Sequence, residues 1–123
     1  MIWDVVVKSP LKYTRNTDRS ITAKVDIVQI GNARLLTIPR ESMPNIGFFL
    51  KQELGAENNL LFGLTNDAFR YILTEVDFDS FARYDYVSRT SLGDQSGEIM
   101  IDPSLKLIPQ LDRATARRAS RGR

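Results

Sequence analysis

The alternation of apolar and polar residues between Ile21 and Ile38 is the feature that most limits what this chain can fold into. Apolar residues lie mainly at every second position from Ile21 to Ile30, which is the period of a half-buried strand. Gly31-Asn32 is typical of a tight turn, and an apolar run ending at Ile38 follows it. The pattern predicts a β-hairpin over Ser20 to Ile38. Pro39 ends it, because proline has no amide hydrogen to donate to a neighbouring strand.

A helix and a further strand are predicted after the hairpin. Pro44 suits a first helical turn, the apolar residues from Ile46 to Leu54 fit one helix face, and Gly55 ends the helix. Asn59 to Leu64 is a short apolar run of the kind found in buried strands. A helix followed by a strand at this spacing indicates part of a βαβ unit or a related layered arrangement. A final helix is expected within Ser96 to Leu111, with Pro103 interrupting or starting it.

The fold class that we expect is therefore α/β. It is a partial layered α/β domain with a β-hairpin, a short buried strand and two flanking helices. At 123 residues the chain has room for one domain.

The chain contains neither cysteine nor histidine. Disulfides, thiolate catalysis and cysteine-bound zinc are therefore excluded. The missing histidine removes the commonest metal ligand and the side chain best suited to proton transfer near neutral pH. An enzyme made from this chain alone has to use carboxylates, tyrosines, serines or lysines.

Positive charge is concentrated at the carboxyl terminus. The formal net charge is +2, but residues 113–123 hold five arginines and no acid, so the remainder has 12 basic and 15 acidic residues. This composition divides the chain into a partial domain over 1–112 and a disordered basic tail over 113–123. A basic arm can bind phosphates of nucleic acid or anionic lipid. Because no aromatic residues interleave with the arginines, we expect no nucleic-acid partner.

Nothing in the sequence indicates a membrane span. There is no run of eighteen apolar residues, and the amino terminus lacks the features of a signal peptide. We expect a cytoplasmic protein.

Polar side chains follow two of the predicted strands. Pro39-Arg40-Glu41 comes directly after the hairpin, and Gly63-Leu64-Thr65-Asn66-Asp67, followed by Tyr71, comes after the next strand. Strand ends are rigid and open onto a crevice, so α/β enzymes tend to build sites there. Taken alone, Glu41 fits a carboxylate in the first turn of the next helix, and Tyr71 fits a packed aromatic at a strand end.

The ordered motifs Leu36 to Glu41, Gly63 to Asp67, Tyr71-Ile72 and Tyr84-Asp85 resemble the later part of the catalytic domain of neutral/alkaline non-lysosomal ceramidases. The resemblance covers about residues 20 to 110. It implies a zinc-dependent amidase that cleaves the N-acyl bond of a ceramide-type lipid, releasing a fatty acid and a sphingoid base.

By motif position, the resemblance makes Glu41 and Tyr71 zinc ligands together with two histidines, and Tyr84 the residue that stabilises charge on the scissile carbonyl. A carboxylate is a good hard ligand for zinc, and a nearby phenol can donate to a carbonyl oxygen as it gains charge. Arg40 stands where a small residue is usual, and its guanidinium either competes for the carboxylate or points into solvent. Arg70 stands where glycine often precedes the tyrosine. Asp85 stands in for glutamate.

The histidine ligands lie upstream in full-length relatives, and two oxygen ligands are too few for a zinc site of ordinary affinity. The leading hypothesis is therefore the carboxyl-terminal fragment of a ceramidase-like hydrolase, inactive alone and completed by an upstream ceramidase-like chain. Its cofactor is zinc, held only in the completed site, and its substrate is a lipid-like amide. A noncatalytic binding or self-assembly module is the alternative, since the hairpin's apolar face needs cover. A nucleic-acid-binding protein driven by the arginine tail is a third reading.

Overall fold

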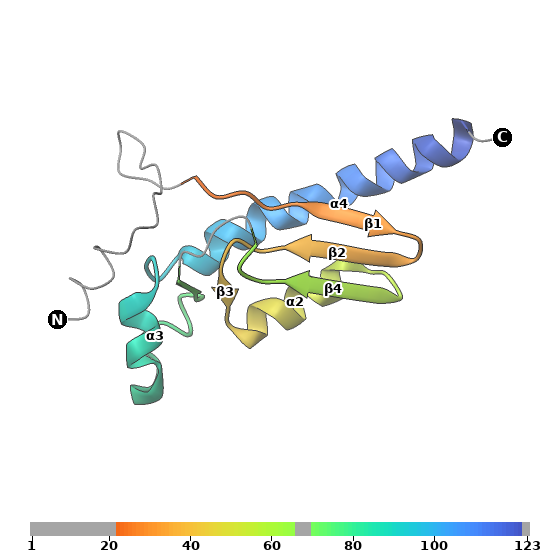
Figure 1. Cartoon of the computed structure of the whole chain (residues 1–123). Coiled ribbons are helices and arrows are strands. Elements are labelled where there is room, and N and C mark those ends of the chain that lie inside the picture. Colours follow the sequence, from red (N-terminus) through yellow and green to blue (C-terminus); the bar gives the residue numbers. More distant parts are fainter. Residues whose placement is uncertain (1–21, 66–69, 122–123) are drawn as a thin grey trace.

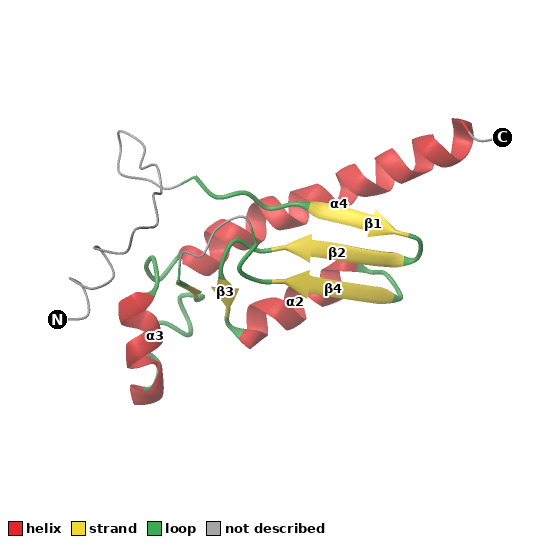
Figure 2. Cartoon of the chain, in the orientation of Figure 1, coloured by secondary structure: helices red, strands yellow, loops and turns green. Residues whose placement is uncertain are grey.

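The computed structural model of the chain describes residues 22–65 and 70–121 (Figure 1). Three strands form one sheet, two helices cover one of its faces, and a second, two-stranded sheet lies beyond the strand ends (Figures 1 and 2). The mixture of helices and strands confirms the expected α/β class. The predictions for Ser20, Ile21, Asn66 and Asp67 lie outside the described residues, as does the part of the predicted domain that precedes Thr22.

The predicted hairpin is present and shorter than expected. Strands β1 (Ile27–Ile30) and β2 (Ala33–Thr37) are antiparallel, with Ile30 opposite Ala33. Gly31 occupies the turn with a φ of 60°, a conformation that glycine adopts without strain. The turn chemistry therefore sets the register of the hairpin.

A βαβ unit follows the hairpin. Helix α2 (Pro44–Leu54) begins at its proline and ends at Gly55, whose φ of 60° is left-handed and whose N–H donates to the carbonyl of Gln52 at 3.2 Å. Strand β4 (Asn58–Phe62) then pairs in parallel with β2, giving the strand order β1-β2-β4. The carboxyl ends of β2 and β4 therefore lie at the same edge of the sheet.

Within residues 22–65 and 70–121, helices cover one face of the sheet. The hydrophobic core combines Leu36 of β2 with residues of α2 and with Met100 of the long helix α4 (Ser96–Arg121). Side chains of the opposite face remain exposed: Val28 and Ile30 on β1, Leu60 and Phe62 on β4. Figure 1 shows α2 and α4 together on the covered side. The described part of the chain thus leaves an apolar sheet face exposed, which we call the uncovered sheet face.

Arg34 joins three elements on the covered side. Its Nη1 donates to the Leu54 carbonyl at the carboxyl end of α2, at 2.6 Å, and its Nη2 pairs with the Asp112 carboxylate on α4. A guanidinium at this helix end also interacts favourably with the helix dipole. The Arg34 side chain is 17% exposed, whereas that of Asp112 is 50% exposed, so solvent weakens the ion pair more than the bond to the helix end.

Strands β3 (Glu41–Ser42) and β5 (Tyr71–Ile72) form the second sheet and are parallel. Neither strand is predictable from the sequence pattern, because a two-residue strand is too short to show a period. The first turn of α4 fixes the chain just after β5. Ser96 Oγ accepts from the Leu73 N–H and donates to the Leu73 carbonyl, both at 3.2 Å, and the Gly97 N–H donates to that carbonyl at 2.7 Å.

The region from Ala82 to Thr90 forms a 3-10 turn, η1 (Ala82–Tyr84), followed by the short helix α3 (Asp85–Thr90). The structure also corrects our expectation for the basic tail. Helix α4 contains Pro103 and Pro109 and continues to Arg121, although every residue from Asp112 to Arg121 is exposed. The reason is propensity: arginine and alanine are strong helix formers, and they extend a helix that is already packed against the core.

None of the helices in the described ranges has a stretch apolar and long enough to cross a bilayer.

Candidate functional site

Glu41 and Tyr71 lie opposite each other on the paired strands β3 and β5. The Glu41 N–H donates to the Arg70 carbonyl at 3.3 Å, and the Met43 N–H donates to the Ile72 carbonyl at 3.1 Å. Opposite residues of neighbouring strands project from the same face, and the strands are about 4.8 Å apart. The structure therefore brings together a carboxylate and a phenol that are thirty positions apart in the sequence.

Glu41 is exposed and Tyr71 is half-buried. Desolvation raises the pKa of the Tyr71 hydroxyl above its ordinary value, and the negative charge of Glu41 and the phenol of Tyr86 raise it further. Tyr71 is therefore a protonated hydrogen-bond donor near neutral pH. A cation beside the same oxygen acts in the opposite direction, because positive charge stabilises the phenolate.

The position of Glu41 excludes one of its two sequence interpretations. It lies in strand β3, and the first turn of α2 contains no acidic residue. The carboxylate therefore does not serve as a first-turn partner of the helix dipole. The other interpretation of Tyr71, as a packed aromatic at a strand end, agrees with the position of its ring. It does not explain why the Glu41 carboxylate lies beside it.

The two arginines beside the pair take different positions. Arg40 is only 6% exposed, so its guanidinium does not point into solvent. Arg70 has a φ of 63°, a left-handed conformation that favours glycine. The ceramidase motif often has glycine before its tyrosine, and the backbone of Arg70 has the geometry that such a glycine would provide. The carbonyl of this same residue accepts the Glu41 N–H and so helps to hold β3 beside β5.

Tyr84, the residue expected to stabilise charge on the carbonyl, belongs to the turn η1. Its ring contacts Phe81, with centroids 5.7 Å apart, and the Arg83 guanidinium, 5.2 Å from the ring centroid. The tyrosine that packs against Tyr71 is Tyr86, edge-on, with centroids 6.1 Å apart. Tyr86, the second residue of α3, was not among the site residues predicted from the sequence.

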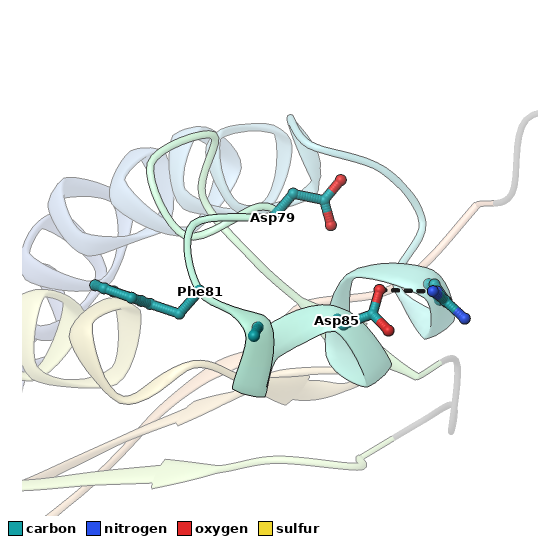
Figure 3. A pocket seen from close by; sticks show the side chains of 5 residues that line it. Asp79, Phe81 and Asp85 are labelled. Carbon is teal, nitrogen blue, oxygen red and sulfur yellow. Dashed lines mark ion pairs between the residues drawn. The ribbon is translucent and has the colours of Figure 1, made fainter.

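An open pocket lies on the surface of the same aromatic segment and is lined by Asp79, Phe81, Ala82, Asp85 and Arg89 (Figure 3). Asp85 and Arg89 form an ion pair at 2.8 Å along α3. The Asp85 charge is thus already compensated by a neighbour on its own helix. Neither Glu41 nor Tyr71 lines this pocket, so we do not assign the site to it.

The side chains paired at β3 and β5 are a carboxylate and a phenol. Zinc sites in proteins accept carboxylate oxygen together with imidazole nitrogen. Within residues 22–65 and 70–121 there is no cluster of three or more carboxylates to complete such a site, and the chain has no histidine.

Comparison of the chain with protein-family models, curated proteins and solved structures gave no match. The resemblance of the motifs to ceramidases, and the roles that it implies for Glu41, Tyr71 and Tyr84, stay predictions.

Proposed function

We propose that this chain is the carboxyl-terminal part of a ceramidase-like amidase and supplies Glu41 and Tyr71 as half of a zinc site. The observation that carries the proposal is the register of β3 and β5, which places these two side chains opposite each other. The left-handed backbone of Arg70, at the position where the ceramidase motif often has glycine, is a second and independent support.

In this proposal, the site hydrolyses an N-acyl linkage of a lipid-like amide. Water adds to the acyl carbon, the C–N bond breaks, and the nitrogen leaves with an added proton, giving a fatty acid and an amine. Zinc, once bound, polarises the carbonyl and lowers the pKa of its water. Glu41 would hold the ion with its carboxylate, and Tyr71 would hold it with its phenol oxygen after loss of the proton.

In this proposal, a phenol near Glu41 and Tyr71 stabilises the negative charge that develops on the carbonyl oxygen of the substrate. Tyr84 was the candidate by motif, and Tyr86 is the one whose ring contacts Tyr71. A phenol donates a hydrogen bond to an oxygen that gains negative charge, which favours the transition state over the ground state. Tyr84→Phe and Tyr86→Phe, compared in the completed enzyme, identify which hydroxyl acts.

The test is complementation. The chain is co-expressed with an upstream ceramidase-like chain that carries the two histidines, and the purified complex is assayed for zinc content and for hydrolysis of a fluorescent N-acyl sphingosine. We expect stoichiometric zinc and measurable hydrolysis, both lost in Glu41→Gln and reduced in Tyr71→Phe. Glu53→Gln, an exposed carboxylate on α2, is the matched control and retains both. Unchanged zinc in Glu41→Gln contradicts the assignment.

The uncovered sheet face favours a second candidate function, a noncatalytic assembly module. Its exposed side chains are large and apolar, with exposed fractions of 67% for Ile30 and 48% for Phe62. Large exposed apolar patches on monomeric proteins mark interaction sites. The two candidate functions can be distinguished, because hydrolysis requires Glu41 and zinc and assembly requires neither.

A further inference from the structure

The carboxyl-terminal part of α4 forms a basic arm that projects from the body of the molecule. Figure 1 shows the helix continuing past the end of the sheet towards the carboxyl terminus. Beyond Asp112 the described helix carries arginine at positions 113, 117, 118 and 121 and no acidic residue. All four arginines are exposed. We call these four side chains the basic face.

The arginines are segregated around the helix. Arg113, Arg117 and Arg121 are spaced by four residues, and Arg118 lies three before Arg121, so the set covers about 140° of the circumference at 3.6 residues per turn. The other side of the arm carries only small uncharged residues: Thr115, Ala116, Ala119 and Ser120. A helix with this distribution presents charge to a partner on one side only.

The basic face lacks a counter-charge within the described part of the chain. The ion pairs found there use Lys24, Arg34, Arg89 and Lys106, and the nearest acid, Asp112, is bound to Arg34. Like charges spaced by four residues on a helix repel and weaken it. An external anion relieves that repulsion, so the arrangement favours binding of a polyanion.

We propose that the basic face docks the protein onto an anionic lipid surface. A guanidinium binds phosphate through paired N–H donors, and a layer of headgroups offers many phosphates in one plane to one side of a helix. Binding of single-stranded nucleic acid normally adds aromatic side chains on which the bases stack, and residues 113–121 contain none. This inference rests on the arm alone and does not depend on the hydrolase proposal.

The test is sedimentation of the full chain with vesicles at low and physiological salt. Phosphatidylcholine vesicles containing phosphatidylserine are compared with pure phosphatidylcholine vesicles. We expect binding only to the anionic vesicles, weakened by salt. The triple variant Arg113→Gln, Arg117→Gln, Arg118→Gln should lower the partition coefficient by roughly a hundredfold. Glutamine is a good helix former, so circular dichroism should show an unchanged fold.

A matched variant controls for net charge. Lys24→Gln, Lys51→Gln and Lys106→Gln together remove the same charge from exposed positions outside the arm, and we expect nearly full binding to persist. Equal binding to neutral vesicles, or an equal loss in the lysine variant, overturns the proposal. Tighter binding to a DNA duplex or to single-stranded RNA than to anionic vesicles also overturns it, and assigns the arm to nucleic acid instead.

Discussion

At the scale of single residues, Tyr71 links the site to the pH dependence of folding. Desolvation, together with Glu41 and Tyr86, raises the pKa of its hydroxyl in the folded state above the value of about 10 in the unfolded chain. The folded state therefore holds this proton more tightly. The resulting stability is fully present below about pH 10 and is lost as pH rises through the folded-state pKa.

We predict that Tyr71→Phe removes this part of the alkaline loss of stability. Urea unfolding, followed by circular dichroism at neutral and strongly alkaline pH, measures the change. Tyr84→Phe, whose ring contacts Phe81 and Arg83 instead, is the matched control and should leave the loss in place. A Tyr71→Phe protein with the same alkaline loss as the parent would show that this hydroxyl carries no folding-linked proton.

The backbone of Arg70 gives a second prediction at this scale. A left-handed conformation costs about 1 kcal/mol or more for a residue with a Cβ, and glycine avoids that cost. Arg70→Ala and Arg70→Gly both remove the guanidinium, so the difference between them isolates the backbone. We expect the glycine variant to unfold with a free energy about 1 kcal/mol higher than the alanine variant, measured by denaturant titration. Equal stabilities would argue against strain at this position.

At the scale of elements, Gly97 fixes the approach of α4 to the chain after β5. A Cβ at this position would lie 2.7 Å from the Leu73 carbonyl oxygen and 3.0 Å from the Thr74 nitrogen, both backbone atoms. We predict that Gly97→Ala destabilises the fold by about 1 to 3 kcal/mol, because the helix has to move away. The change is measured by thermal and denaturant unfolding.

Gly47→Ala on α2 is the control for Gly97→Ala. A Cβ there meets only the end of the Leu61 side chain, at 3.4 Å, and alanine favours a helix interior. We expect this variant to match or exceed the parent in stability. Equal losses at the two positions would mean that helix propensity, and not the contact with Leu73, governs the result.

Elements with strong local signals were predictable from the sequence. Gly31, Pro44 and Gly55 each occupy the turn or helix end that their backbone preferences favour, and the βαβ arrangement followed from element order. The two-residue strands β3 and β5 were missed, since tertiary pairing and not local propensity forms them. The helical tail was missed because apolar periodicity was given more weight than the high helix propensity of arginine and alanine.

The candidate site was predictable only in part, for the same reason. Glu41 and Tyr71 were identified from strand-end motifs, but their opposition depends on the pairing of two strands that the sequence does not reveal. The contact between Tyr86 and Tyr71 was not predicted, because the sequence does not show how the chain is oriented after the turn at Ala82–Tyr84. Which side chain is contacted after such a turn depends on the tertiary structure and not on the local sequence.

At the scale of the whole molecule, the uncovered sheet face makes self-association testable. We predict that the chain forms oligomers in light scattering and that Ile30→Lys with Phe62→Lys shifts it to the monomer, because burying two charges in that contact is costly. Phe48→Lys is the control: Phe48 is 74% exposed but lies on α2, away from the sheet face. A monomeric parent at all concentrations contradicts the prediction.

The hydrogen bond and the ion pair of Arg34 determine where the projecting part of α4 begins. Asp112 is the last residue of α4 that these interactions tie to the sheet, and the next residue, Arg113, begins the projecting arm. The nine residues from Arg113 to Arg121 then extend the helix about 13 Å beyond that ion pair. A spectroscopic label at Ser120 would therefore report how this end of α4 is oriented, and Arg34→Met, which removes the ion pair, would broaden the range of orientations.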